Sequence, residues 1–430
     1  MVDNTAFIAA ETAAHHDEAV KGGKARTVST DGEIADGYQI VKDVFIENFV
    51  GKREHHGAAL AVYHKGKLVV DLWGGVADRV GGKQWNKNTY ASIFCCTKSL
   101  AAICMAMKVD RGECSYTDKV TKYWPEFGRN DKNDITIEMI LTHRAGLPNF
   151  DADFTLAEVT PEKISKIIEA ESPKYMPGTK TSYHAITYGW LIDQLFCRID
   201  KRQRSISDFF HDEIQKKHGV EVSVGTSPEL EELTAKFPPV TKRITLRDYI
   251  HDRKIFSISN YLKKSTKEIS RMRLKNEVVE MFNDPEIRLA AQPAISGIAT
   301  ARGLAQTYKL FMKGTLVSKQ FLKQISEPQF VNEFDHALGC EESKGYGFVY
   351  YKSSTGSWQI GHPAIGGQRV YMDPANKLVV CYLTNGMKTW VGDHPLCFKN
   401  LQLAIYQAAE SHGQLTCSAE VIDEAIRGSK

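Results

Sequence analysis

Strand-forming segments lie near both ends of this 430-residue chain, with a long stretch of helix and loop patterns between them. Residues 58–63 and 67–73 are rich in apolar and β-branched residues, and the His-Lys-Gly that joins them indicates a hairpin turn. Strand patterns return late in the chain, at residues 346–351, 358–361, 370–372 and 378–383. We therefore predict an α+β fold, with one sheet built from both ends and a mostly helical insertion.

The domain boundaries follow from the same patterns. Residues 1–36 are polar and rich in small residues, so we predict an N-terminal extension there. The rest of the chain, 37–430, is expected to form one domain with two parts. The sheet part takes in about 37–95 and 341–430, and the helical part takes in about 96–340.

The overall composition excludes several classes of protein. The net charge is only +3 and the isoelectric point is about 8.2, which gives no basis for a nucleic-acid partner. The nine cysteines are an odd number without Cys-x-x-Cys spacing, which favours a reducing compartment over a disulfide scaffold. The first residues lack the pattern of a secretory signal, and no apolar stretch approaches the length of a membrane span. We expect a cytoplasmic protein.

Metal and cofactor sites are not indicated either. The adjacent histidine pairs at 15–16 and 55–56 do not match the spacing of known metal sites, and no His-Glu-x-x-His motif is present. Solvated histidines are the simpler interpretation of both pairs. We therefore expect neither a bound metal nor a cofactor.

The first segment that carries chemistry is Phe-Cys-Cys-Thr-Lys-Ser, at residues 94–99. It stands at the start of a segment whose apolar residues repeat with helical spacing. A nucleophile at the N-terminus of a helix is favoured by the positive end of the helix dipole. Lys98 follows Cys95 by three residues and so lies one turn further along the same helix face. This spacing makes Cys95 and Lys98 candidate site residues.

Two further segments can complete such a site. Residues 177–185 (Pro-Gly-Thr-Lys-Thr-Ser-Tyr-His-Ala) lead into a predicted helix at 186–199 and can bring the phenol of Tyr183 to a cleft. Residues 361–367 (Gly-His-Pro-Ala-Ile-Gly-Gly) form a glycine-rich loop between two predicted strands. Such a loop can offer backbone N–H groups and the imidazole of His362 at the edge of a sheet.

The order and spacing of the three segments resemble the β-lactamase-related family, which includes class C β-lactamases, D-Ala-D-Ala peptidases and esterase-like serine hydrolases. The esterase-like branch, which typically reads Phe-Ser-Cys-Thr-Lys at the first segment and Tyr-His-Ala at the second, looks most similar. The likeness covers roughly residues 37–410. It implies a β-lactamase/transpeptidase-like fold, in which an antiparallel sheet is flanked by helices and a mostly helical domain is inserted.

The resemblance also implies roles for single residues. The nucleophilic serine of the family's Ser-x-x-Lys motif falls on Cys95, its lysine on Lys98, and the tyrosine of the second motif on Tyr183. The third motif, Lys/His-x-Gly, falls on His362-Pro363-Ala364, with alanine in place of glycine. In relatives the backbone N–H groups of the nucleophile and of the residue after this motif bind the oxyanion. Those groups belong to Cys95 and Ile365 here.

The nucleophile is the main departure from the family pattern. No serine in the chain is followed by a lysine three positions later, so the nucleophile is Cys95 or there is none. A thiol beside an ammonium group at a helix N-terminus is a plausible nucleophile. Because a thiolate leaves more readily than an amine, esters and thioesters would be easier substrates than amides.

Two functions remain open on these residues. The first is an acyl hydrolase or acyltransferase that acts on a small ester, thioester or amide through a Cys95 acyl-enzyme, with Lys98 and Tyr183 handling protons. The alternative is a catalytically inactive scaffold or ligand-binding protein that keeps the pocket. The partner in the first case is a small-molecule acyl substrate.

A basic segment at residues 242–275 stands apart from these motifs. It contains 11 Lys/Arg against 3 Asp/Glu, a local net charge of +8, interleaved with apolar residues. A solvated helical face is one interpretation of this pattern. The other is a basic amphipathic surface for an anionic ligand or a membrane.

Overall fold

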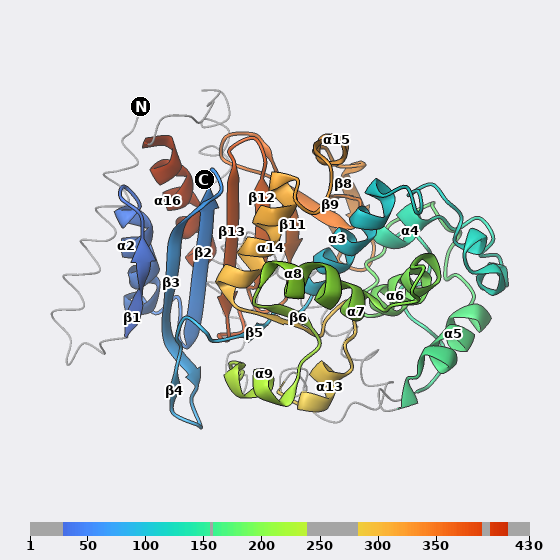
Figure 1. The fold of residues 1–430 in the computed structure, drawn as a ribbon, viewed down its shortest axis with the longest axis horizontal. Coiled ribbons are helices and arrows are strands. Elements are labelled where there is room, and N and C mark those ends of the chain that lie inside the picture. The colour runs from blue at the N-terminus through green and yellow to red at the C-terminus, as the bar shows by residue number, and fades with distance from the viewer. Residues whose placement is uncertain (1–28, 155–157, 239–282, 389–395, 412–430) are drawn as a thin grey trace.

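A computed structural model describes residues 29–154, 158–238, 283–388 and 396–411. Its centre is a ten-stranded sheet in which neighbouring strands are antiparallel. Figure 1 shows helices on both faces of this sheet and a mostly helical part beside it. The predicted α+β fold, with an antiparallel sheet flanked by helices, is confirmed.

The order of the strands shows how the two ends of the chain meet. The sheet runs, from edge to edge, through β1 (Thr30–Ile34), β3 (Lys67–Asp78), β2 (Gly57–His64), β13 (Leu378–Thr384), β12 (Arg369–Asp373), β11 (Trp358–Pro363), β10 (Phe348–Lys352), β9 (Cys340–Gly345) and β8 (Phe330–Asp335). The short β4 (Lys83–Gln84) pairs with β3. At the junction, β13 pairs with β2 so that Leu378 lies opposite His64 and Thr384 opposite Ala58. One sheet is therefore built from both ends, as predicted.

Both edge strands of the sheet come from segments for which the sequence analysis predicted no strand. The extension expected over residues 1–36 contributes β1, which pairs with β3, and the span expected to be helical contributes β8. That span also supplies β6 (Val222–Val224) and β7 (Gly297–Ala299), which join β5 (Ala91–Ser92) in a second, three-stranded sheet. Edge strands are short and carry polar residues because one side faces solvent, so their sequences look like loops.

Two helices cover one face of the large sheet, and two more cover the other. The C-terminal helix α16 (Leu396–Ser411) packs with α2 (Gln39–Val50) and shares a core with β2, β3 and β13. On the opposite face, α14 (Ala301–Lys313) packs against β2, β12 and β13, and α3 (Cys96–Asp110) packs against β11. The result is a three-layer arrangement with a separate apolar core on each side of the sheet.

The remaining helices lie mainly beside the sheet, around α6 (Figure 1). They are α4 (Ile137–Leu141), α5 (Pro161–Ala170), α6 (Thr187–Ile199), α7 (Ile206–Phe210), α8 (Lys216–His218), α9 (Pro228–Leu233), α13 (Pro285–Leu289) and α15 (Lys319–Gln324). The helix expected at 186–199 is thus present as α6. No helix in the described part of the chain is both long and apolar enough to cross a bilayer. The basic segment 242–275 lies outside the described residues.

Helix α3 is the element that positions the site. All its residues from Cys96 to Lys108 are buried, so neighbouring elements surround it on all sides. Its alanine, leucine and methionine content favours a helix intrinsically. Because both ends of such a helix are held by tertiary contacts, the direction of its first turn is set by the whole fold.

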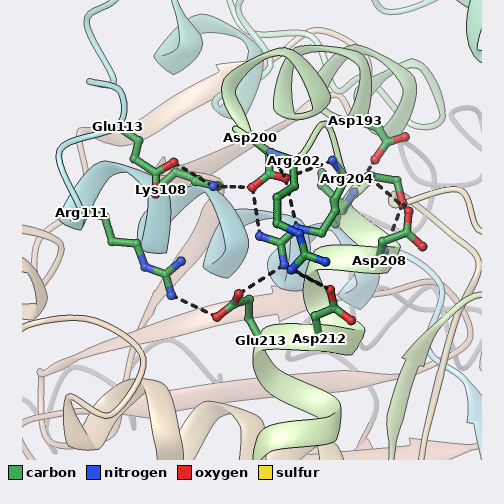
Figure 2. A network of polar contacts seen from close by, with 12 residues as sticks. Lys108, Arg111, Glu113, Asp193, Asp200, Arg202, Arg204, Asp208, Asp212 and Glu213 are labelled. Atoms are coloured by element: carbon green, nitrogen blue, oxygen red, sulfur yellow. Dashed lines mark hydrogen bonds and ion pairs between the residues drawn. The ribbon is translucent and has the colours of Figure 1, made fainter.

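A buried ion network holds the far end of α3 (Figure 2). The Lys108 Nζ lies 2.6 Å from the Asp200 Oδ1 and 2.9 Å from the Glu113 Oε2. Asp200 also accepts hydrogen bonds of 3.0 Å from the Arg204 guanidinium, which in turn pairs with Glu213. The side chains of Lys108 and Asp200 are 3% and 2% exposed, so this pair is shielded from water and salt. The network fixes α3 to the end of α6.

Candidate active site

The turn that leads into α3 is strained. Phe94 has a φ of 43°, in the left-handed region that bulky residues avoid at a cost of about 1–2 kcal/mol. Its ring packs against Phe237, with centroids 5.2 Å apart, and this buried contact offsets the strain. A hydrogen bond of 2.9 Å from the Ile93 N–H to Gly297 O also holds this turn in place. The strand-to-helix turn therefore presents Cys95 in one fixed direction.

Cys95 is the N-cap residue of α3 and is partly exposed. The Thr97 hydroxyl donates to Phe94 O at 2.5 Å and accepts the Gly297 N–H at 3.0 Å, which ties down the first turn. The hydroxyl of Ser99 donates to Cys96 O at 2.6 Å and is fully buried. Ser99 is therefore engaged by its own helix and cannot replace Cys95 as a nucleophile.

Lys98 is completely buried, and its amino group has three partners. The Nζ donates to Ala185 O at 2.7 Å and to Ala294 O at 3.2 Å, and it lies within hydrogen-bonding reach of the Cys95 thiol. An ammonium group has three N–H donors, so these partners satisfy it completely. Burial lowers the pKa of Lys98 below that of an ordinary lysine, while the nearby Cys95 thiol opposes this shift. A larger fraction of Lys98 is therefore in the neutral amine form than in a solvated lysine at the same pH.

The Tyr183 ring lies beneath the Lys98 amino group, which is 4.9 Å from the ring centroid. Its backbone N–H donates to the Asp335 Oδ1 at 3.0 Å. The imidazole of His143 contacts the Tyr183 ring from another side, with centroids 4.5 Å apart. Tyr183 is 7% exposed, so its position is fixed by packing on several sides.

The histidine next to Tyr183 points away from the site and holds the motif in place. The Nε2 of His184 accepts the Leu147 N–H at 3.0 Å, so its Nδ1 carries the proton and donates to Ser182 O at 2.6 Å. The His184 N–H donates to the Nδ1 of His143 at 3.1 Å. Burial lowers the pKa of His184 to about 4 and that of His143 well below its usual value, so both imidazoles stay neutral.

The glycine-rich third segment connects β11 to β12 as predicted. Gly366 and Gly367 both have positive φ, and a Cβ on Gly366 would lie 2.8 Å from the Met387 Sδ and 3.7 Å from the Phe94 ring. The turn that follows Ile365 therefore packs beside the turn that precedes Cys95. Among the described residues, no hydrogen bond involves the backbone N–H of Cys95 or that of Ile365. Both N–H groups can therefore still act as hydrogen-bond donors.

His362 lies at the end of β11 as a neutral side chain. Its Nδ1 donates to Pro363 O at 2.5 Å, and its ring centroid is 6.3 Å from that of Tyr183. Burial, reinforced by the positive charge of Lys98, lowers the pKa of His362 to about 3. The Cys96 thiol donates to His362 O at 3.1 Å and so links this strand to α3.

This neutrality predicts a pH profile. A histidine with a pKa of about 3 is already uncharged above about pH 4, so its titration cannot produce an acidic limb between pH 5 and 8. We expect His362→Asn to lower kcat/KM for an ester. Any acidic limb between pH 5 and 8 in the pH profile should keep its apparent pKa, because another group produces it. The measurement is kcat/KM against pH for both proteins. A limb that moves or vanishes in the variant would show that the imidazole titrates there.

The structure brings Cys95, Lys98, Tyr183 and His362 together around the N-terminus of α3. Ile365 directly precedes Gly366, which packs beside Phe94. Asp335, which contacts the second segment, was not identified from the sequence. It lies in Phe-Val-Asn-Glu-Phe-Asp, a stretch without any catalytic pattern that forms the edge strand β8. Only its contacts in the folded chain distinguish it from the other acidic residues.

Comparison with known proteins finds a matching family and similar structures. The sequence profile of the Beta-lactamase family matches residues 43–396. The Esterase/beta-lactamase LipL of Mycobacterium tuberculosis is 27% identical over 280 residues, an alignment that spans 64% of this chain and 63% of that protein. The chain thus spans less than two thirds of the length of this curated relative.

Solved structures of similar fold extend over most of the chain. A family VIII carboxylesterase superposes with a TM-score of 0.76 at 24% identity and covers 88% of this chain and 100% of its own. EstA from Arthrobacter nitroguajacolicus Rue61a superposes with a TM-score of 0.73, also at 24% identity, and covers 89% of this chain and 100% of its own. These likenesses identify the fold as β-lactamase/transpeptidase-like.

Proposed function

Because the chain belongs to the beta-lactamase family, we propose that it is an acyl hydrolase or acyltransferase that forms a Cys95 acyl-enzyme with a small ester or thioester. The relative LipL is named as an esterase/beta-lactamase, and a protein of similar structure is named as a family VIII carboxylesterase. A small-molecule acyl substrate is consistent with both names. In this proposal Cys95 takes the place of the serine that is the family's usual nucleophile.

The observation that carries the proposal is the set of partners around the Lys98 amino group. Two backbone carbonyls, Ala185 O and Ala294 O, accept two of its hydrogen atoms. In the neutral amine the remaining position on nitrogen is a lone pair, and the remaining neighbour is the Cys95 thiol. The lone pair is therefore directed at the proton that must leave the nucleophile. A solvated surface lysine would have no such directionality.

The acylation step then needs no further base. The Cys95 thiol gives its proton to Lys98, and the Sγ attacks the substrate carbonyl carbon, so that a C–S bond forms and the π electron pair moves to the carbonyl oxygen. The N–H groups of Cys95 and Ile365 donate to this oxyanion. When the C=O double bond re-forms, the bond to the leaving alkoxide or thiolate breaks, and the leaving group takes a proton from Lys98 by way of the Tyr183 hydroxyl.

Deacylation reverses these proton transfers. Water, or another acceptor alcohol, attacks the thioester carbon while its proton passes to the Lys98–Tyr183 pair. The C–S bond breaks, and the departing Cys95 sulfur regains a proton from Lys98. The product is a free acid with water and a new ester with an alcohol. The neutral His362 supplies no positive charge for a substrate carboxylate, which favours uncharged acyl substrates.

The proposal predicts that Cys95 is the most reactive thiol among the described cysteines. Cys340 is the matched control, because it too is partly exposed. Cys197 is a second, slower control, because it is partly exposed but burial raises its pKa to about 12. At neutral pH we expect iodoacetamide to label Cys95 about tenfold or more faster than either control. We expect Lys98→Met to remove this advantage. The measurement is the labelling rate of each peptide by mass spectrometry.

The same experiment separates the two hypotheses drawn from the sequence. If Cys95 reacts no faster than Cys197 and Cys340, the thiol is not activated, and the inactive scaffold or binding protein is favoured. If Cys95 reacts fast and Lys98→Met reacts equally fast, the nucleophile is activated by something other than this lysine.

A further inference from the structure

We propose that Asp335 is a positioning residue for Tyr183, acting through the backbone of the second segment from the edge strand β8. This inference rests on the proposed function, because Tyr183 is assigned there to proton transfer. Asp335 and Tyr183 are 152 positions apart in the sequence. The link is therefore a product of the fold.

Among the described residues, both oxygens of the Asp335 carboxylate accept hydrogen bonds. Its Oδ1 accepts the Tyr183 N–H at 3.0 Å, together with the N–H groups of Ala337 at 3.0 Å and Leu338 at 3.1 Å. Its Oδ2 accepts a hydrogen bond of 2.9 Å from the Lys344 Nζ. One oxygen thus binds the turn of the β8–β9 hairpin and the backbone of Tyr183 at the same point.

Neighbouring contacts align the hairpin with the whole second segment. The His336 N–H donates to Thr181 O at 3.0 Å, and Thr181 and Asp335 form a parallel β-bridge. Glu333 lies two residues before Asp335 in β8, and its carboxylate accepts a hydrogen bond from the hydroxyl of the same Thr181. Glu333 also pairs with Arg144, whose guanidinium donates to Gly178 O. The segment before Tyr183 is therefore attached to β8 by backbone and side-chain contacts.

The charge of Asp335 is maintained in the interior. Its side chain is completely buried, and the Lys344 side chain is 2% exposed. Burial alone would raise the pKa of Asp335, but the positive charge and hydrogen bond of Lys344 outweigh it and lower the pKa. The carboxylate thus stays ionised and remains a strong acceptor for three N–H groups.

The consequence concerns the distance between the phenol and its proton partner. The Tyr183 ring lies under the Lys98 amino group. The backbone position of Tyr183 is held by the hydrogen bond that its N–H donates to Asp335. A shift of about 1 Å in a group that transfers protons can reduce turnover about 100-fold. Loss of the acceptor should therefore reduce kcat with little change in KM, because substrate contacts at Cys95 and Ile365 are untouched.

The test compares two double variants that differ only in the acceptor. Asp335→Asn with Lys344→Met removes both charges and keeps a carbonyl oxygen facing the Tyr183 N–H. Asp335→Leu with Lys344→Met removes both charges and the oxygen, with a side chain of similar shape. Neither leaves one charge of the Asp335–Lys344 pair alone in the core, so both are expected to fold. Both also remove the 3.1 Å ion pair of Lys344 with Glu342, so this loss is the same in the two variants. We expect the asparagine variant to retain most of the wild-type kcat and the leucine variant to lose about 10- to 100-fold, each with KM nearly unchanged.

Two controls separate positioning from general loss of structure. In a Tyr183→Phe background the leucine and asparagine variants should have the same kcat, because the group being positioned is gone. Asp200→Ala breaks an equally buried lysine–carboxylate pair at the other end of α3. It should lower stability with little change in kcat, because the contacts of Thr97 with Gly297 and of Phe94 with Phe237 still hold the turn at Cys95. Equal kcat values in the two double variants would overturn the proposal. So would a difference in kcat between them that stays the same in the Tyr183→Phe background.

Hydrogen exchange gives a readout that does not depend on turnover. The Tyr183 amide should be protected in the wild type and in the asparagine variant, and should exchange faster in the leucine variant. If the wild type hydrolyses none of the esters and thioesters offered to it, the proposed function fails, and exchange at this amide still decides whether Asp335 holds Tyr183. Unchanged protection in the leucine variant would refute the inference whatever the activity.

Discussion

Cys95→Ala is expected to reduce ester and thioester hydrolysis by about 10⁴- to 10⁶-fold, because a nucleophile that forms a covalent intermediate cannot be replaced by its neighbours. The wild type should also gain the mass of the acyl group at Cys95 when mixed with an activated ester, and the alanine variant should not. Initial rates and intact-protein mass spectrometry measure these two effects. Turnover that survives in Cys95→Ala would place the reaction at another residue.

The serine variant distinguishes a working cysteine site from one that has lost its original nucleophile. Cys95→Ser recreates Ser-Cys-Thr-Lys, the pattern typical of the esterase-like branch, with Lys98 and Tyr183 unchanged. We expect this variant to lose activity, since a hydroxyl is far less acidic than a thiol and needs a stronger base. Ester hydrolysis that appears only in Cys95→Ser would mean that the natural chain is an inactive scaffold. Equal, substantial turnover by both would show that the site does not distinguish sulfur from oxygen.

Asp200→Ala is expected to lower the free energy of unfolding by about 3–5 kcal/mol at pH 7, since it leaves Lys108 buried beside an empty space. The Lys108 side chain is 3% exposed and would retain only Glu113 as an anionic partner within 4.0 Å among the described residues. Urea denaturation of the two proteins measures the difference. A loss below about 1 kcal/mol would indicate that water or a rearranged Glu113 compensates the lysine.

The same pair predicts how the difference depends on pH. Burial would raise the pKa of Asp200, but hydrogen bonds from Arg204 and Lys108 outweigh it and hold the pKa well below its usual range. A group whose pKa is lower in the folded state stabilises the protein fully above its unfolded pKa, about 4 for aspartate, and loses this contribution as the pH falls. The gap between wild type and Asp200→Ala should therefore narrow below about pH 4.

Replacing both partners is the matched control. In Lys108→Met with Asp200→Leu no charge of the pair remains, so most of the lost stability should return. Arg204 keeps Glu213 as a partner in this variant. A double variant as unstable as Asp200→Ala would show that packing, and not the unpaired lysine, causes the loss.

The sequence alone determined the features that depend on local geometry. The three-residue spacing of Cys95 and Lys98 places both on one helix face wherever that helix lies, since 3.6 residues complete a turn. Runs of apolar and β-branched residues and a Gly-containing turn identified the β2–β3 hairpin in the same way, and β10 to β13 followed from similar short runs. The family resemblance depends on the order of three short motifs, and that order is a property of the chain itself.

Only the tertiary structure decided how the groups of the proposed proton transfers are arranged. The two carbonyls that orient the Lys98 amino group lie 87 and 196 positions away, and the carboxylate that holds Tyr183 lies 152 positions away. Burial keeps His362 neutral, although a histidine with this sequence context in water would titrate near pH 6.5. Desolvation and hydrogen bonding act through space between segments that the fold brings together, so no local pattern in the chain encodes them.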